Sequence, residues 1–290
     1  MNDDNEEGFY RKFIKSSYVG VSLVIFTFTS NHPFDYLKTI KQANLSNSLT
    51  NRALVSNIYN LNGIKGFYTG GRANFLRAVL KESYRNPLRG FLKSFYSEKI
   101  PKSIQIKYPE IRNVTTGVSM AGFDTFILCP LERIKVWVMT ATNKPQLTSY
   151  FHQNQNLLRD LFKGLKVSFV KSAASWTSYL VFEEDIRKFV MKSDTNNDEI
   201  TISKQVLIGF LAGVANSILT LPFDTIKTQM QKYDSNSEKQ LIFSTFRNIV
   251  TAHGVKGLYA GWLFRLPSYI IVAIITSHNI QKIDKIWNIS

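Results

Sequence analysis

The sequence predicts an all-α fold built from three similar repeats, and two observations support this prediction. Uncharged apolar runs are long enough to be membrane-helix candidates, and one Pro–acid–base motif occurs three times at nearly equal spacing. The 290 residues include 36 Lys plus Arg against 21 Asp plus Glu, a formal net charge of +15. This balance favours anionic partners, and a hydrophobic share of 44% excludes a disordered chain.

The apolar runs come first in the argument. Residues 16–34 and 205–223 contain no Asp, Glu, Lys or Arg, and a shorter run of this kind covers residues 266–281. A helix of about 19 residues is roughly 28 Å long, close to the thickness of the bilayer's hydrocarbon region. A large soluble protein can also bury an apolar helix on all sides, so these runs leave both alternatives open.

The start of the chain carries no targeting pattern. Four acidic residues within the first nine are opposite in charge to a secretory or transit peptide. We therefore expect no cleavable signal and an address within the folded chain. The single cysteine, Cys129, excludes a disulfide framework within the chain and a cysteine-based zinc cluster.

The threefold motif sets the architecture. Its copies read HPFDYLKTIKQ at 32–42, CPLERIKVWVM at 129–139 and LPFDTIKTQMQ at 221–231, so each has Pro, any residue, an acid, two residues and a base. The prolines lie 97 and 92 residues apart. A glycine precedes each proline by thirteen residues, and an aromatic residue, one further residue and a glycine follow downstream. Three features in register indicate three copies placed end to end.

On these residues the chain resembles the mitochondrial carrier family of solute transporters, whose signature is Pro-x-[Asp/Glu]-x-x-[Lys/Arg]. The resemblance covers nearly the whole chain. It implies an all-α membrane protein with six transmembrane helices in three pseudo-symmetric repeats, at residues 1–107, 108–200 and 201–290. It also implies a short amphipathic surface helix in each repeat. The expected setting is the mitochondrial inner membrane, with a monomer in contact with the lipid bilayer and its cardiolipin, and with no cofactor, metal or nucleic acid.

The expected long helices follow from the repeat. They cover residues 12–42, 71–96, 111–140, 165–190, 202–231 and 262–286. Apolar spacing between the members of a pair predicts surface helices, for example at Leu54, Ile58 and Leu61 or at Phe243, Phe246 and Val250. We expect a helix kink at each motif proline, namely Pro33, Pro130 and Pro222, because proline removes a backbone donor.

The motif acids and bases lie three residues apart and so share one helix face. The resemblance implies that the acid of one odd-numbered helix pairs with the base of the next and closes the matrix side. The expected pairs are Asp35 with Lys135, Glu132 with Lys227, and Asp224 with Lys38. The alternative is that these are solvated surface pairs of little energy. Gln42 and Gln231 are either braces under the pairs or ordinary polar residues at helix ends.

The resemblance also places substrate contacts seven residues after the repeat glycines. These positions are Arg77, Lys171 with the adjacent Ser172, and Ser268, and Arg265 lies close to the last. Arginine offers a two-pronged donor for phosphate or carboxylate and lysine a point charge, so the predicted solute is a small anion. The alternative is that these bases extend to a membrane interface.

Asp124 is a carboxylate inside an expected membrane helix, six residues before a motif proline. Such a residue is a functional-site hypothesis, with Arg77 or Lys171 as its expected partner. It could instead bind a proton or a cationic part of the substrate.

The expected gate on the cytosolic side is eroded. Only Glu184 and Arg187 keep the family's acid and base, while the first repeat offers Lys93 opposite a glycine and the third offers Gln281 with Asp284. Our hypothesis is that this weaker gate relaxes obligatory exchange, the antiport typical of the family.

Nucleotide transport is the first prediction for the solute, because Tyr179 and Trp176 can stack on a base. Phosphate, a carboxylate or an amino-acid-like zwitterion is the alternative. The sequence KTQMQ after the third motif differs from that of ordinary ADP/ATP exchangers.

Two other protein classes fit the sequence less well. A soluble nucleic-acid-binding protein would explain the charge, but the bases are spread over the chain and no such motif occurs. The four isolated histidines offer no catalytic or metal-binding pattern, so no enzyme is expected. The eroded motifs indicate a divergent member, and a source in a pathogen that acts on host mitochondria is our hypothesis.

Overall fold

The computed structural model describes residues 3–45, 49–141, 150–151, 156–192, 202–232 and 242–287, and every regular element in these residues is a helix. The all-α prediction is therefore confirmed for this part of the chain. Six of the described helices have 26 residues or more. They are α1 (Asp3–Ala43), α3 (Gly71–Lys99), α5 (Ile111–Thr140), α8 (Leu165–Lys192), α9 (Ile202–Gln231) and α11 (Trp262–Trp287).

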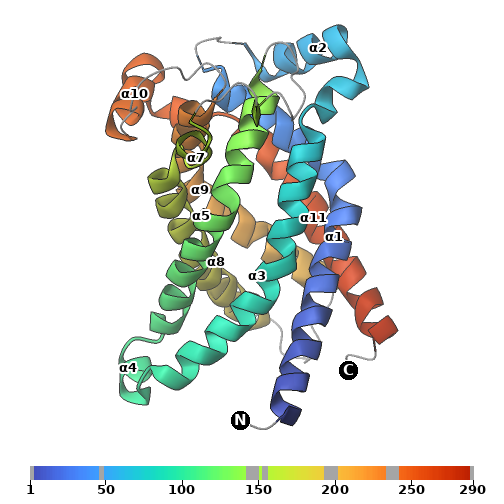
Figure 1. Cartoon of the computed structure of the whole chain (residues 1–290), viewed down its shortest axis with the longest axis vertical. Coiled ribbons are helices and arrows are strands. Elements are labelled where there is room, and N and C mark those ends of the chain that lie inside the picture. Colours follow the sequence, from blue (N-terminus) through green and yellow to red (C-terminus); the bar gives the residue numbers. More distant parts are fainter. Residues whose placement is uncertain are drawn as a thin grey trace.

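The long helices form a closed ring. Helix α1 packs against α3 and α11, and the ring continues from α3 through α5, α8 and α9 back to α11. Figure 1 shows the long helices running along the long axis of the molecule, with both termini at one end. The motif prolines Pro33, Pro130 and Pro222 lie inside α1, α5 and α9. A ring of six helices leaves its centre to the side chains that point inward.

Shorter helices lie outside the ring, and most of them gather at the end opposite the termini (Figure 1). They are α2 (Asn51–Asn62), the 3₁₀ helix η1 (Ile64–Tyr68), α7 (Leu157–Leu161) and α10 (Ile242–Leu258), while α4 (Lys102–Lys107) lies near the other end. The side chain of Thr50 accepts a hydrogen bond from the Ala53 amide and begins α2. Gly63, at φ 58°, follows its last residue.

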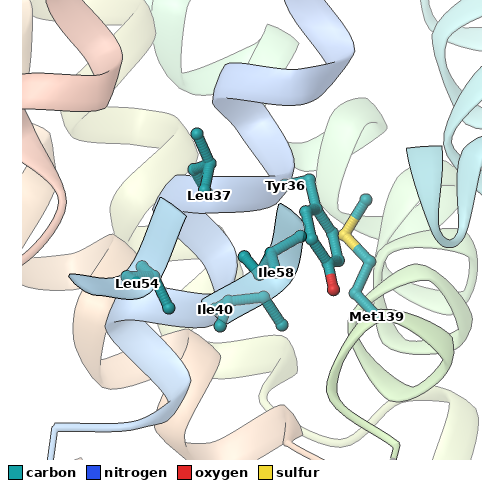
Figure 2. Packing of buried hydrophobic residues seen from close by; sticks show 6 residues of the cluster. All are labelled: Tyr36, Leu37, Ile40, Leu54, Ile58 and Met139. Atoms are coloured by element: carbon teal, nitrogen blue, oxygen red, sulfur yellow. The ribbon is translucent and has the colours of Figure 1, made fainter. Parts of the chain in front are cut away.

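The apolar face of α2 packs on α1 and α5. Leu54 and Ile58 belong to one buried cluster with Tyr36, Ile40 and Met139. Figure 2 shows Ile58 beside Tyr36 and Ile40, with Met139 on the other side of the Tyr36 ring. The predicted surface helices are present at α2 and α10, but their buried faces differ from those expected. Leu61 is 79% exposed and Phe243 is 73% exposed, because the buried face of each helix is narrower than the apolar spacing suggested.

Three glycines determine how the second long helix of each third begins. Gly70, Gly164 and Gly261 precede α3, α8 and α11 with φ of 72°, 82° and 80°, a left-handed conformation that favours glycine. A Cβ added to them would lie 2.8 Å from Met139, 3.4 Å from Gln231 and 3.2 Å from Lys38. The helices α3, α8 and α11 therefore begin in close contact with the C-terminal parts of α5, α9 and α1, respectively. Each of these contacts joins two different thirds of the chain.

Small residues also allow the two helices within a third to approach closely. A Cβ on Gly20 would lie 2.7 Å from the Glu82 carbonyl on α3, and one on Gly117 would lie 2.8 Å from Thr177 on α8. In the last third the expected Gly209 is exposed. There Gly213 takes the close contact, 2.9 Å from the ring of Tyr269. The close approach is thus shifted by one helical turn between α9 and α11.

Candidate functional site in the central cavity

The ring encloses a cavity of about 540 Å³ that is lined by all six long helices. This volume lies within the range of small-molecule sites. Its lining includes nine basic side chains, namely Lys38, Arg77, Lys81, Arg85, Arg89, Lys135, Lys171, Lys227 and Arg265. The five acidic side chains are Asp35, Glu82, Asp124, Glu132 and Asp224. The excess of positive charge makes the cavity suited to an anion.

The three ion pairs expected between the motif residues are present. Lys135 Nζ lies 2.5 Å from Asp35 Oδ2, and Lys38 Nζ lies 2.5 Å from Asp224 Oδ2. Lys227 binds Glu132. The side chains of Lys135, Lys227 and Asp224 are only 8%, 7% and 6% exposed, so the alternative of solvated surface pairs is wrong. We call these six residues the floor network; they join α1, α5 and α9 in a closed triangle.

Three further basic side chains form ion pairs with acids of the floor network. Asp224 also binds Lys171, at 2.7 Å, and Arg265. Arg77 approaches Glu132 at 3.5 Å. These are three of the predicted substrate contacts, and their sharing of partners with the floor network was not predicted from the sequence. Six bases around three acids leave this end of the cavity with an excess of positive charge.

The remaining predicted contacts also line the cavity, namely Ser172, Tyr179 and Ser268. The Ser268 hydroxyl donates to the carbonyl of Phe264 at 3.4 Å, a long hydrogen bond. Their roles toward a substrate stay predictions.

Asn74 links the predicted substrate contact Arg77 to the floor network. It was not identified from the sequence as a site residue. Its Nδ2 lies 3.1 Å from Asp35 Oδ2 and 2.8 Å from Nδ1 of the buried His32. Its Oδ1 accepts two hydrogen bonds from Arg77, at 3.1 and 3.2 Å. Its position three residues before Arg77, on the same helix face, was the signal that could have found it.

The two glutamines do not brace the ion pairs. Gln42 bonds to the hydroxyls of Thr225 and Thr228, each at 3.2 Å, and Gln231 donates to the Lys163 carbonyl at 2.8 Å. Both are fully buried. Gln42 thus joins α1 to α9 and Gln231 joins α9 to the segment before α8, and in the described part of the chain neither is hydrogen-bonded to a side chain of the floor network.

The prediction that Asp124 pairs with Arg77 or Lys171 was wrong. Its carboxylate binds Arg85, through Nε at 3.0 Å and through Nη2, rather than Arg77 or Lys171. The Trp176 indole donates to it at 2.6 Å, and so does the Tyr84 hydroxyl. Four donors thus hold a side chain from α5 between α3 and α8. The physical reason is depth: Asp124 lies almost two turns before the motif proline, away from the floor network.

In the part of the chain that the structure describes, the cavity lining does not include the residues of the expected cytosolic gate. Glu184 accepts a hydrogen bond from Asn113 at 2.8 Å and pairs with Lys188 at 3.1 Å. Lys93 and Arg187 lie on α3 and α8. The side chains of Gln281 and Asp284 are outside the described part of the chain. The gate role of Lys93, Glu184 and Arg187 stays a prediction.

A further ion pair, between Arg133 on α5 and Asp160 on α7, lies outside the cavity. Arg133 donates to both carboxylate oxygens of Asp160, at 3.2 and 2.9 Å, and Tyr150 also donates to this carboxylate. Burial favours the protonated acid, but the hydrogen bonds from Arg133 and Tyr150 outweigh it and lower the pKa of Asp160. Arg133 also donates to the Gln231 carbonyl, so this pair anchors α7 to α5 and α9.

Comparison with known proteins identifies a family of transport proteins. The family model "Mitochondrial carrier protein" matches residues 10–99 and 198–288. Mitochondrial citrate transporter B of Aspergillus niger is 27% identical over 83% of this chain and 82% of its own length. The mitochondrial carnitine carrier of Saccharomyces cerevisiae is 27% identical over 87% and 81%. Mitochondrial magnesium exporter 1 of Drosophila melanogaster is 29% identical, over 55% of each chain.

The names of these relatives point to chemically different solutes, so the similarity identifies a family and no single substrate. The family model matches more than half of the chain, in its first and last thirds. By this match, the chain belongs to the mitochondrial carrier family of transport proteins.

Proposed function

We propose that the chain is a multi-pass transporter of the mitochondrial inner membrane that moves an anionic solute through the central cavity by alternating access. The observation that carries this proposal is the excess of bases at the floor network. Six cations surround three carboxylates there, and all of them line one cavity. A cavity with unbalanced positive charge and low-dielectric walls attracts anions.

The outer surface of the ring supports a membrane setting. Each long helix carries exposed large apolar side chains, such as Ile25, Leu76, Phe126, Phe169, Ile218 and Ile274. Within the described residues, α5 and the Val206–Gln231 part of α9 are long and apolar enough to cross a bilayer by themselves. The charges that lower the hydropathy of the other long helices include those that line the cavity, where charge is tolerated. We therefore propose that all six span the membrane, as three pseudo-symmetric repeats.

The floor network supplies a gate in this proposal. It closes the end of the cavity near α2 and α10, which the family resemblance assigns to the matrix side. An entering anion competes with Glu132 and Asp224 for Arg77, Lys171 and Arg265. This competition weakens the ties that join α3 to α5 and that join α8 and α11 to α9, so the solute itself promotes rearrangement of the helices around the floor network and opening toward the matrix.

Two classes of anion fit best. A nucleotide remains the first candidate, because the aromatic residues Phe34, Tyr179 and Phe264 line the same cavity as the bases. A tricarboxylate is the second, because the citrate transporter matches four fifths of the chain. Both carry several negative charges, which the surplus bases can bind.

The test is uptake of labelled ATP, citrate and phosphate into liposomes of cardiolipin-containing lipid that hold the purified monomer. Arg77→Ala and Lys171→Ala should each abolish uptake of the transported anion. Arg72→Ala is the matched control, because Arg72 lies on the same helix, is exposed and is outside the cavity lining. A folded protein that takes up none of these anions would overturn the proposal and direct the search to cations.

A further inference from the structure

A row of basic side chains follows one wall of the cavity. Arg77, Lys81, Arg85 and Arg89 lie at intervals of four residues on α3, and all four line the cavity. Four residues correspond to about 6 Å of helix, so the row extends roughly 18 Å from the floor network. We call these four residues the basic row.

The basic row belongs to α3 alone. Above the floor network and its three added cations, the bases lining the cavity in the described part of the chain are Lys81, Arg85 and Arg89. On α8, one and two turns after Lys171, the lining residues are Ser175 and Tyr179. The three thirds of the chain thus form a similar floor but differ higher in the cavity.

The upper part of the row has unused binding capacity. Lys81 pairs with the adjacent Glu82 at 2.7 Å, and Arg85 pairs with Asp124 through Nε and Nη2. Arg85 Nη1 and the whole Arg89 guanidinium have no ion pair or hydrogen bond with the residues that the structure describes. The Trp176 ring lies 5.1 Å from the Arg85 guanidinium carbon and helps to fix its position.

We propose that Arg85 and Arg89 form a second anion subsite above the floor network. It takes the second phosphate or carboxylate of an elongated solute whose first anionic group binds among Arg77, Lys171 and Arg265. The inference rests on the proposed function and narrows it to solutes with two anionic ends separated by about 12 to 18 Å, the helix length from Arg77 to Arg85 and Arg89. Guanidinium groups suit such ends because they donate two parallel hydrogen bonds to an oxyanion.

The experiment compares ligands of defined length on the purified full chain in detergent. The probes are inorganic phosphate, α,ω-bisphosphonates with a short or a long alkane chain, and an alkyl monophosphonate with the same long chain. The last probe supplies the apolar chain without the second charge. Dissociation constants are measured calorimetrically for the wild type, Arg77→Gln, Arg89→Gln, Arg89→Lys and the exposed control Arg72→Gln.

The wild type should bind the long bisphosphonate about tenfold more tightly than the short one and the long monophosphonate, the gain expected from one more charge-assisted contact. Arg89→Gln should remove this preference and leave phosphate binding unchanged. Arg89→Lys should retain part of the preference, and Arg72→Gln should retain all of it.

Two results would overturn the subsite alone. One is a wild type without preference for the long bisphosphonate; the other is an Arg89→Gln variant that weakens all four probes by one common factor, as a general field effect would. In both cases the wild type still binds phosphate and the Arg77→Gln variant does not, so the proposed function survives. If no anionic probe binds the folded wild type, both proposals fail.

Discussion

Lys171 on α8 binds Asp224 on α9, with Nζ 2.7 Å from Oδ1. The first residue was predicted as a substrate contact and the second as a gate acid. Lys38 and Arg265 share the same carboxylate. Binding and gating residues are therefore one connected network, and changes to it should affect stability and transport together.

Asp224→Asn should lower the midpoint of thermal unfolding by several degrees. Three cations lose their charged partner in a buried site, and removing one partner of a buried ion pair costs about 3–5 kcal/mol. The measurement is thermal unfolding of the purified protein in detergent. Asp185→Asn is the control, since Asp185 has a side chain 59% exposed and only a 4.0 Å contact with Lys188. Equal midpoints for Asp224→Asn and the wild type would show that the network does not hold the helices together.

Exchanging the charges of the Asp35–Lys135 pair tests whether transport requires opposite charges at these two positions or requires these two residues in their present places. Asp35→Lys places two cations against each other between α1 and α5 and should abolish uptake into liposomes. Adding Lys135→Asp restores opposite charges and should recover part of the uptake, though not the hydrogen bond that Asn74 gives to Asp35. The coupling between the two sites is obtained from the double-mutant cycle. A double variant as inactive as the single one would mean that the pair is not required as a pair.

Asp124→Asn should destabilise the protein, because the partly buried Arg85 then loses the fully buried carboxylate that it pairs with. The double variant Asp124→Asn/Arg85→Gln should lose less stability than the sum of the two single variants. Thermal unfolding and uptake are measured on the same samples. If Asp124→Asn changes uptake at an unchanged unfolding midpoint, Asp124 is a substrate ligand rather than a structural link.

The Asp160–Arg133 pair should make stability depend on acid pH. The pKa of Asp160 is lower in the folded chain than its ordinary value of 3.8, so the ionised acid stabilises the fold above that pH. This contribution is lost as the pH falls through the folded-state pKa. Asp160→Asn should therefore be less stable than the wild type at neutral pH, and the difference should shrink at pH values below 3.8, as followed by unfolding at each pH. A difference independent of pH would assign the effect to lost packing.

The repeat pattern in the sequence predicted the long helices, and the family resemblance that it carries predicted the three ion pairs. The helix ranges follow from the repeat, although α1 begins at Asp3 rather than at residue 12, and the family resemblance paired acids such as Glu132 with the base of the next motif, Lys227. The shared helix face is a local feature, because an acid and a base three residues apart lie on one face wherever the helix lies. The pairing between helices is not local and was predicted from the resemblance alone. Gly70, Gly164 and Gly261 were visible as a glycine repeated at the same place in each third, but their left-handed conformation comes from the structure.

Only the tertiary structure decided how residues at different depths meet. The partner of Asp124 is Arg85, and Lys171 and Arg265 converge on Asp224, because the rotation and height of each helix bring these side chains together. Spacing along one helix cannot fix its height relative to another. The sequence by itself therefore determined the repeated helices and their charged faces, and packing between helices decided which charges are paired and which, like Arg89, line the cavity without a described partner.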